Sequence, residues 1–380
     1  MKKHQLAAMI LSALSASVLI SCTKPNDSSK DTAEKQETES KVSSAQSGAN
    51  NQKNQANKAI DIAPATAESY LTQVANNQIL TAYQNAVKQS TSLQALATQS
   101  CQAGGLVSND ELEALRTQWL ELAKAWAQAE VVGFGPAMGS MSNLYINYYP
   151  DERGLVHQGV IDLIEANPKL TAEQLSSESA IVQGIPGLEE VLFSNDSLTA
   201  EQCQYVISAS QALSERLTQV EQAWENSPEK LLGIGGDENK TGLNRWMNSI
   251  LSLVETTKST SLDQPLGITG NKKGHLPAAT AGHSRDIITA KVAALNKALT
   301  DPALVAILSE SGNDTVADEM STLLAETSTL LAQLPQDLAQ ATPEQQKSLY
   351  EKLTQLTQII KHQLMPTLGV QVGFNSTDGD

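Results

Sequence analysis

Apolar residues recur every three or four positions through most of the chain beyond residue 60, which is the spacing of one face of an α-helix. Runs of β-branched residues are short. Two clear helical runs in the first half consist of Tyr70, Val74, Ile79, Leu80 and Tyr83, and of Leu112, Leu115, Trp119, Leu122 and Trp126. The pattern therefore predicts an all-α fold.

Local start signals divide this pattern into separate helices. Ser108 or Asn109 precedes the second run, and Thr199 with Gln202 forms a capping box. Leu155–Ala166 and Ser284–Leu299 have helical periodicity, as do residues 317–334 and 343–364. Residues 264–283 form a long loop rich in glycine and proline, and such loops are often functional.

Glycines between residues 233 and 236 interrupt the helical pattern and suggest a domain boundary. Each side of this boundary offers about four helices. We therefore expect two antiparallel four-helix-bundle-like domains, over residues 61–232 and 237–376.

The N-terminus has the pattern of a bacterial lipoprotein signal. Lysines at positions 2 and 3 precede an apolar run over residues 6–20 that is too short to span a bilayer comfortably. Leu19-Ile20-Ser21-Cys22 then resembles a lipoprotein cleavage site. We expect residues 1–21 to be removed and Cys22 to carry the lipid. An ordinary secretory signal with an incidental cysteine is the alternative.

Residues 22–60 contain almost no large apolar side chain and consist mainly of Ser, Asn, Gln, Lys, Asp and Glu. Such a segment cannot bury enough surface to offset the entropy of ordering it. We expect a disordered tether reaching roughly 35 Å. Thr23, in place of an aspartate after the lipidated cysteine, favours the outer membrane and a location facing the periplasm.

Charge and cysteine content narrow the function classes. The net charge is −16, which argues against nucleic acid as a partner because binding phosphates requires Lys and Arg. With Cys22 assigned to lipid, Cys101 and Cys203 remain. In an oxidising compartment the two could form a disulfide or stay as buried thiols, and both alternatives are open.

The stretch from Gly184 to Phe193, Gly-Ile-Pro-Gly-Leu-Glu-Glu-Val-Leu-Phe, has the features of a helix start. Pro186 suits the first helical position. Glu189 and Glu190 would then lie in the first turn, where the helix dipole favours negative charge. A well-started helix with its apolar residues facing a core explains the segment without any ligand.

The chain lacks several catalytic motifs, among them His-Glu-x-x-His, a phosphate-binding loop and a Gly-x-Ser-x-Gly elbow. No two histidines stand three or four residues apart. The acidic end, with Asn375, Asp378 and Asp380, lacks the ligand spacing of a calcium loop. Glu130 follows Trp126 by four residues on an apolar face, so its carboxylate must be paired, coordinated or at the edge of that face.

Several segments together resemble the imelysin-like family. The decapeptide is similar to the family signature Gly-x-His-x-x-Glu, with Glu189 as its glutamate and Pro186 at the histidine position. The other matching segments are residues 125–130, 134–136, 149–154, 368–370, 373–375 and 378–380. The likeness spans residue 60 to the C-terminus and is strongest to periplasmic lipoproteins that carry proline in the signature.

This resemblance implies a two-bundle architecture with a site at the junction of the bundles. It implies a membrane-tethered binding or accessory protein in uptake of iron or another divalent cation, working with partner proteins of metal uptake. The expected site residues are Glu189, Glu130, Arg153, Trp126, Asp151 and Arg285. We expect Glu189 to lie near Glu130, with Arg153 offsetting their charges.

Two other function classes stay open. A metallopeptidase needs about three protein ligands and an open position on the metal, and Pro186 removes the only imidazole of the motif. The remaining oxygen ligands favour a harder ion or none. A structural or docking lipoprotein without a ligand is the third class.

The lipoprotein hypothesis can be tested at its cysteine. We expect Cys22→Ser to abolish lipidation, so that the protein lacks the mass of the lipid and leaves the membrane fraction. Mass spectrometry and membrane fractionation measure both effects. An unchanged mass and unchanged membrane association would contradict the assignment of Cys22.

Overall fold

The computed structural model describes residues 59–101 and 107–373. The predicted signal peptide, Cys22, nearly all of the predicted tether and the acidic end with Asn375, Asp378 and Asp380 lie outside these residues. The described part is built from helices and contains no β-strand, which confirms the predicted all-α fold.

The helices of the first half are α1 (Pro64–Gln73), η1 (Val74–Leu80), α2 (Thr81–Cys101), α3 (Asn109–Ala129), α4 (Pro136–Gly139), α5 (Ser142–Ile146), α6 (Leu155–Ala166), α7 (Ala172–Ser176), η2 (Ala180–Val182), α8 (Gly184–Phe193) and α9 (Ala200–Asn226). Those of the second half are α10 (Pro228–Leu232), α11 (Glu238–Lys258), η3 (Ser259–Asp263), α12 (Gln264–Leu266), α13 (Ser284–Leu299), α14 (Pro302–Glu310), α15 (Asp314–Gln333), η4 (Leu338–Gln340), α16 (Pro343–Ile359), η5 (Ile360–Leu364) and α17 (Met365–Thr367).

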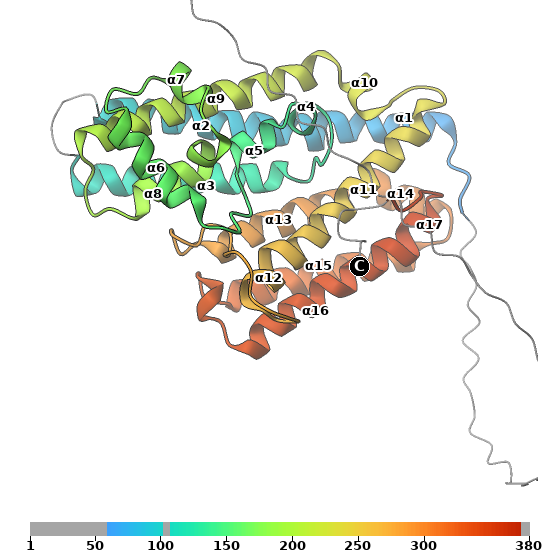
Figure 1. Ribbon diagram of the computed structural model, residues 1–380. Helices are drawn as coiled ribbons and strands as arrows, with labels where there is room; N and C mark the ends of the chain where they lie inside the picture. The colour runs from blue at the N-terminus through green and yellow to red at the C-terminus, as the bar shows by residue number, and fades with distance from the viewer. Residues whose placement is uncertain (1–58, 102–106, 374–380) are drawn as a thin grey trace, which may run out of the picture. The chain divides into compact units, whose positions relative to one another are not determined.

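Two groups of helices lie one against the other (Figure 1). In the first group, α2 packs beside α3 and α9. Helices α7 and α8 pack against α9, and α6 packs against α8 and α9. In the second, α16 packs against α11 and α15, while α13 packs against α15. Helix α13 also lies along α3, so this pair joins the two groups.

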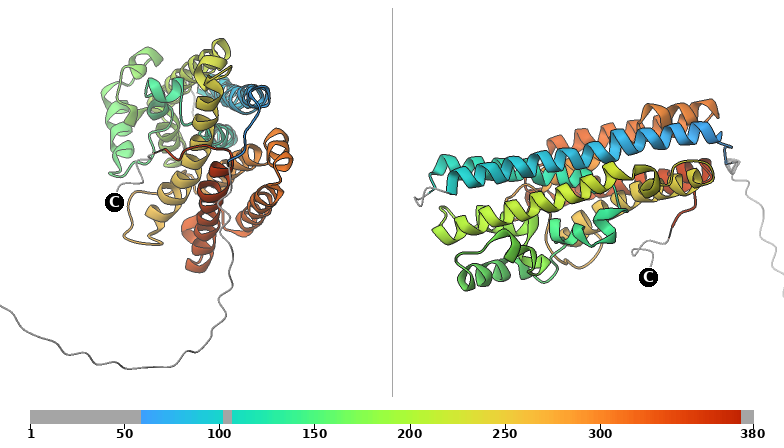
Figure 2. Two further views of the ribbon diagram at one scale, coloured as in Figure 1. Left: turned by 90° about the vertical axis from the view of Figure 1, so that its right-hand side faces the viewer. Right: turned by 90° about the horizontal axis from the view of Figure 1, so that it is seen from above.

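The first long helical segment of the fold, called the rod below, is made of three consecutive helices. Helices α1, η1 and α2 follow one another without a break, as the views in Figure 2 show. The α1 end of this rod packs against α11 and α14 of the second half. All described residues belong to one compact unit, and the domain boundaries 61–232 and 237–376 stay a prediction.

Helix starts follow the local signals read in the sequence. Ser108 Oγ accepts a hydrogen bond from the Glu111 N–H at 3.3 Å, and Glu111 Oε2 accepts one from the Ser108 N–H at 2.8 Å. Thr199 and Gln202 form the same capping box at the start of α9. Each box satisfies backbone donors that a helix start leaves unpaired.

Two details of the predicted elements differ from the structure. Helix α14 was absent from the predicted set, although Asp301 at its N-cap accepts from the Ala303 N–H and Pro302 occupies its first position. An N-cap aspartate followed by proline is a start signal in its own right. The loop predicted from residue 264 begins at Gly267, because η3 and α12 extend α11 as far as Leu266.

No single helix among the described residues is both long and apolar enough to cross a membrane; the bent pair α13 and α14 meets that test only jointly, by length and composition.

A disulfide links Cys101, the last residue of α2, to Cys203 in the first turn of α9. Its cysteines stand 102 residues apart in the sequence and hold two long neighbouring helices together at one end. The structure thus decides between the alternatives left open for these cysteines, and the disulfide is the correct one.

The disulfide predicts the thiol content of the protein. In a Cys22→Ser background, the denatured and non-reduced chain should show no free thiol, and reduction should release those of Cys101 and Cys203. Reduction should lower the free energy of unfolding by up to about 4.7 kcal/mol, the chain-entropy value for a loop of roughly 100 residues. Thiol titration and urea unfolding measure these effects. Two free thiols before reduction would contradict the bridge.

Candidate functional site

The motif at the start of α8 packs so closely against its neighbours that two of its positions require glycine. Gly184 has φ +68°, and a Cβ there would lie 2.3 Å from the carbonyl oxygen of Ile146. A Cβ on Gly187 would lie 2.2 Å from the hydroxyl oxygen of Tyr205. Only glycine fits at both positions, so the motif has a packing role before any chemistry is considered.

The helix begins two residues earlier than the sequence suggested. Helix α8 starts at Gly184, so Pro186 is its third residue and not its first. The prediction that Glu189 and Glu190 lie in the first turn is therefore wrong, and the first turn contains no acidic residue. Glu189 lies in the second turn, and its side chain enters the interior.

Glu189 holds the loop that precedes α13. Its side chain is buried, and Oε1 accepts a hydrogen bond from the Ala281 N–H at 3.0 Å. Burial raises the pKa of Glu189 from 4.5 to about 7, and the charge of Glu190 adds to this rise. Hydrogen bonds from the backbone N–H groups of Ala281 and Thr280 oppose it. The like charge that acts on Glu189 is thus Glu190, whereas the sequence pointed to Glu130.

Glu130 caps the end of α3 and is held by three groups. Its Oε1 accepts hydrogen bonds from Trp126 Nε1 and Asn147 Nδ2, both at 3.1 Å. Its Oε2 lies 2.9 Å from Nζ of Lys291, a buried residue of α13. This ion pair connects the two helix groups at the place where α3 and α13 run together.

Lys291 is the cation that pairs with Glu130, which is the role expected for Arg153. Arg153 is exposed and lines neither cavity described below, so the prediction that it offsets the charges of Glu130 and Glu189 is wrong. The signal for Lys291 was present in the sequence. It follows Ile287 by four residues in a helix of otherwise apolar periodicity, so it lies on the same face as a core residue.

The other two predicted site residues have local structural contacts. Asp151 is buried, and its Oδ2 accepts from the Val156 N–H at 2.8 Å, at the start of α6. Arg285 pairs with Asp286 at 3.2 Å and donates to the carbonyl oxygen of Leu334 at 2.9 Å. Neither lines the cavities around Glu130.

Glu130, Glu189 and Trp126 do come together, around an inner cavity of about 40 Å³. Helices α3, α8 and α13 supply its walls together with residues 275–278 of the loop. Tyr149 and His275, which sequence reasoning did not assign to the site, also line it. The Tyr149 hydroxyl donates to the backbone carbonyl of His275 at 3.0 Å. Burial raises the pKa of Tyr149, and the charges of Glu130 and Glu189 raise it further.

A second, outer cavity of about 240 Å³ adjoins the first. The two share a wall made of Trp126, Glu130, Asn147, Tyr149 and Lys291. The partly buried ion pair therefore lies between the two cavities and contributes to the lining of both.

These residues do not fit a directly bound divalent cation. Within residues 59–101 and 107–373, no three His, Cys, Asp or Glu side chains are grouped so that they could hold a metal ion. The ammonium of Lys291 already lies against Glu130, and backbone N–H groups occupy the Glu189 carboxylate. A cation bound to Glu130 would have to displace the ammonium or be repelled by it.

Comparison with known proteins identifies the family. The family model described as Imelysin matches residues 79–363. This chain belongs to the imelysin family. No curated protein gives a significant match.

Two solved structures share the imelysin fold of this chain. An imelysin-like protein from Psychrobacter arcticum is 61% identical, with a TM-score of 0.81, and the match covers 83% of this chain and 99% of that one. A putative iron-regulated protein A precursor from Parabacteroides distasonis is 13% identical, with a TM-score of 0.64 and coverage of 79% and 95%.

The burial of Glu189 predicts a pH-dependent stability. Because the pKa of Glu189 is raised in the folded state, its contribution to stability is fully present below the ordinary value of 4.5 and is lost as pH rises through about 7. The full loss is on the order of 3 kcal/mol. Glu189→Gln removes this loss. The free energy of unfolding of the variant, relative to that of the wild type, should therefore increase between about pH 5 and about pH 8.

Urea unfolding at about pH 5 and about pH 8 measures this increase in the free energy of unfolding. Glu68→Gln, at an exposed position of α1, is the matched control and should change the free energy of unfolding by less than about 0.5 kcal/mol. An advantage of Glu189→Gln that is the same at both pH values would show that Glu189 does not titrate in this range.

Proposed function

We propose that this imelysin-family protein is a lipid-tethered binding or accessory component of the bacterial cell envelope that acts in uptake of iron or another metal. The lipid anchor and the periplasmic location rest on the N-terminal sequence. The link to metal rests on the family and on the fold shared with a protein named as a putative iron-regulated protein A precursor.

The observation that supports a binding role is the partly buried Glu130–Lys291 pair between two cavities. Charged groups are expensive to bury, and they are commonly found where a pocket needs a few well-placed polar contacts. The pair is assembled from both halves of the chain, α3 and α13, as expected for a site at the junction of the helix groups.

The same observation separates this proposal from a metallopeptidase. Metal-activated water needs about three protein ligands and an open position. Glu130 faces an ammonium, and Glu189 accepts backbone hydrogen bonds. The metal in this proposal is therefore cargo of the uptake system, handled as a complex or through a partner protein, and not an ion coordinated by these two carboxylates.

Metal uptake in a strain that lacks the gene tests this proposal. We expect the strain to accumulate less iron, or less of another metal, and the wild-type chain to restore the level. The double variant Glu130→Gln/Lys291→Met should fail to restore it. Changing both residues leaves neither charge buried without a partner, which would otherwise cost about 3–5 kcal/mol. Radiometal uptake and elemental analysis of cells give the measurement.

Lys297→Met is the matched control for this experiment. Lys297 lies on the same helix α13 but lines neither cavity, so its variant should restore uptake. Immunoblots of membrane fractions check that each variant is present. An unchanged metal content in the deletion strain would overturn the uptake role. Chelator-sensitive peptide hydrolysis by the purified protein would instead support the peptidase class.

A further inference from the structure

The outer cavity is lined by both apolar and polar side chains. Val132 and Leu253 are buried apolar residues that line it, and Met138 and Leu144 add further apolar surface. Hydroxyl groups of α11 and η3 also line the cavity, together with the ion pair. These hydroxyl residues are Ser252, Thr256, Thr260 and Ser261. A ligand that contacts both kinds of side chain must be amphipathic.

The polar end of this cavity presents one donor and one acceptor side by side. Glu130 Oε2 is buried and accepts no hydrogen bond from the described residues, since its 2.9 Å contact with Lys291 Nζ is an ion pair without hydrogen-bond geometry. Lys291 Nζ also donates to Ser261 Oγ at 3.3 Å. An ammonium has three N–H donors, so these two contacts leave it a further one.

Exposed apolar side chains gather at the edge of the same cavity. Of the five exposed large hydrophobic residues in the described part, three lie in the short segment of α4 and α5: Met138, Met141 and Leu144. Met141 also has φ +55°, a left-handed conformation that residues with a side chain rarely adopt. Local strain and exposed apolar groups together are typical of binding sites.

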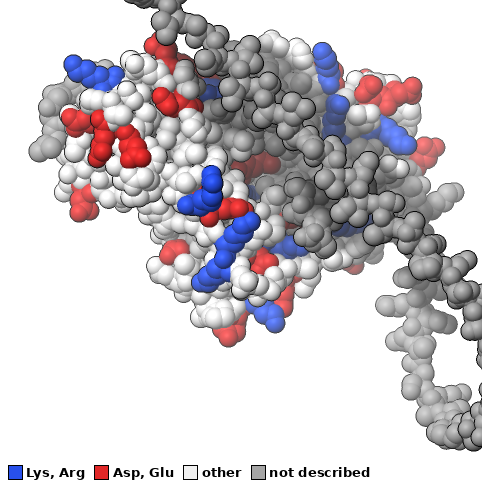
Figure 3. Space-filling model, in the orientation of Figure 1, with Lys and Arg blue, Asp and Glu red and all other residues white. Residues whose placement is uncertain are grey.

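On the face drawn in Figure 3, the acidic and basic side chains of the described residues are scattered among uncharged ones. The charged side chains that line the outer cavity are those of the ion pair, which is itself neutral overall. A ligand that adds no net charge avoids the large cost of burying an unpaired ion.

We infer that the outer cavity binds a small zwitterion with an apolar side chain, of the chemical class of the aliphatic α-amino acids. Its ammonium group would pair with the Glu130 carboxylate, and its carboxylate would accept from Lys291 Nζ. Its side chain would lie against Met138, Leu144 and Leu253. The site goes beyond the uptake role and does not depend on a bound metal.

Calorimetric titration of the purified full chain with three matched probes tests this site. L-leucine carries both charged groups, isocaproate lacks the ammonium, and isopentylamine lacks the carboxylate. Each truncated probe leaves one buried partner unsatisfied, so we expect each to bind at least about 10-fold more weakly than leucine. Binding of either truncated probe as tight as that of leucine, or no binding of leucine, would overturn the zwitterion assignment.

Two surface variants locate the site without disturbing the core. Leu144 is 38% exposed and lines the cavity, whereas Ile161 is 36% exposed and lies on α6 outside it. Leu144→Gln should weaken leucine binding several-fold, and Ile161→Gln should leave it unchanged. Equal effects of the two would place the ligand elsewhere. If the wild-type chain binds no leucine while the metal phenotype is as expected, this inference falls and the uptake role stands.

Discussion

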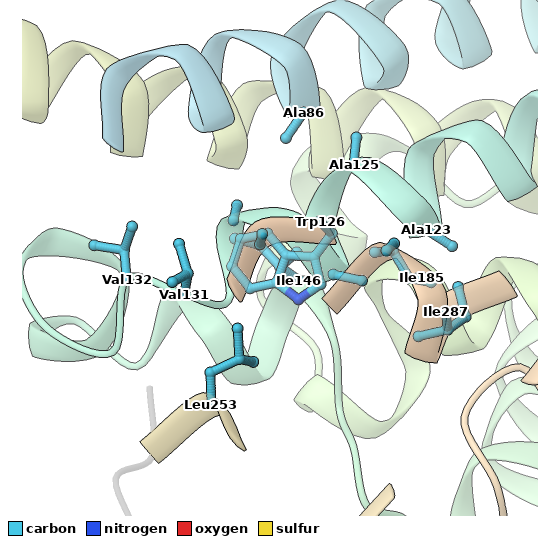
Figure 4. Close-up of a cluster of buried hydrophobic side chains, with 14 of the residues drawn as sticks. Ala86, Ala123, Ala125, Trp126, Val131, Val132, Ile146, Ile185, Leu253 and Ile287 are labelled. Atoms are coloured by element: carbon cyan, nitrogen blue, oxygen red, sulfur yellow. The ribbon is translucent and has the colours of Figure 1, made fainter. Parts of the chain in front are cut away.

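The ion pair between Glu130 and Lys291 is the constraint on which the junction of the fold depends. A buried ammonium needs an anion within reach, and the anion comes from the end of α3 while the ammonium comes from the middle of α13. Trp126, which donates a hydrogen bond to Glu130, has its indole among apolar side chains that include Ile185 and Ile287 (Figure 4). Low dielectric there strengthens both the attraction and the cost of losing it.

The signature motif has a physical explanation that does not involve a metal. Gly184 and Gly187 allow the backbone and Tyr205 to approach α8 closely, and Glu189 accepts hydrogen bonds from the loop before α13. That loop contains Ala278, which has φ +51° and lines the inner cavity. The glutamate therefore holds a strained segment over the site, and burial alone accounts for most of its raised pKa.

Local signals made the helices predictable, but they could not identify the partners of the buried charges. Capping boxes at Ser108 and Thr199 act within four residues, so the sequence locates both helix starts. The periodicity placed Glu130 on an apolar face and so required a partner for it. Arg153 was the expected cation because it is an isolated cation beside a turn, in a segment that resembles the family. Lys291 reaches Glu130 only through the packing of α13 on α3. Such long-range pairing is set by tertiary structure.

Stability alone does not explain why a charged pair stands at this junction. Replacing a buried ion pair with well-packed apolar residues is often neutral or even stabilising, by about 1–4 kcal/mol. The surroundings of Glu130 are rich in apolar side chains that could have accommodated such a replacement, as Trp126 and Leu253 show. Both charges instead line two cavities, and one carboxylate oxygen accepts no hydrogen bond from the described residues. An ion pair that lines two cavities is better explained by a ligand that enters them than by the packing of the two helices that it joins.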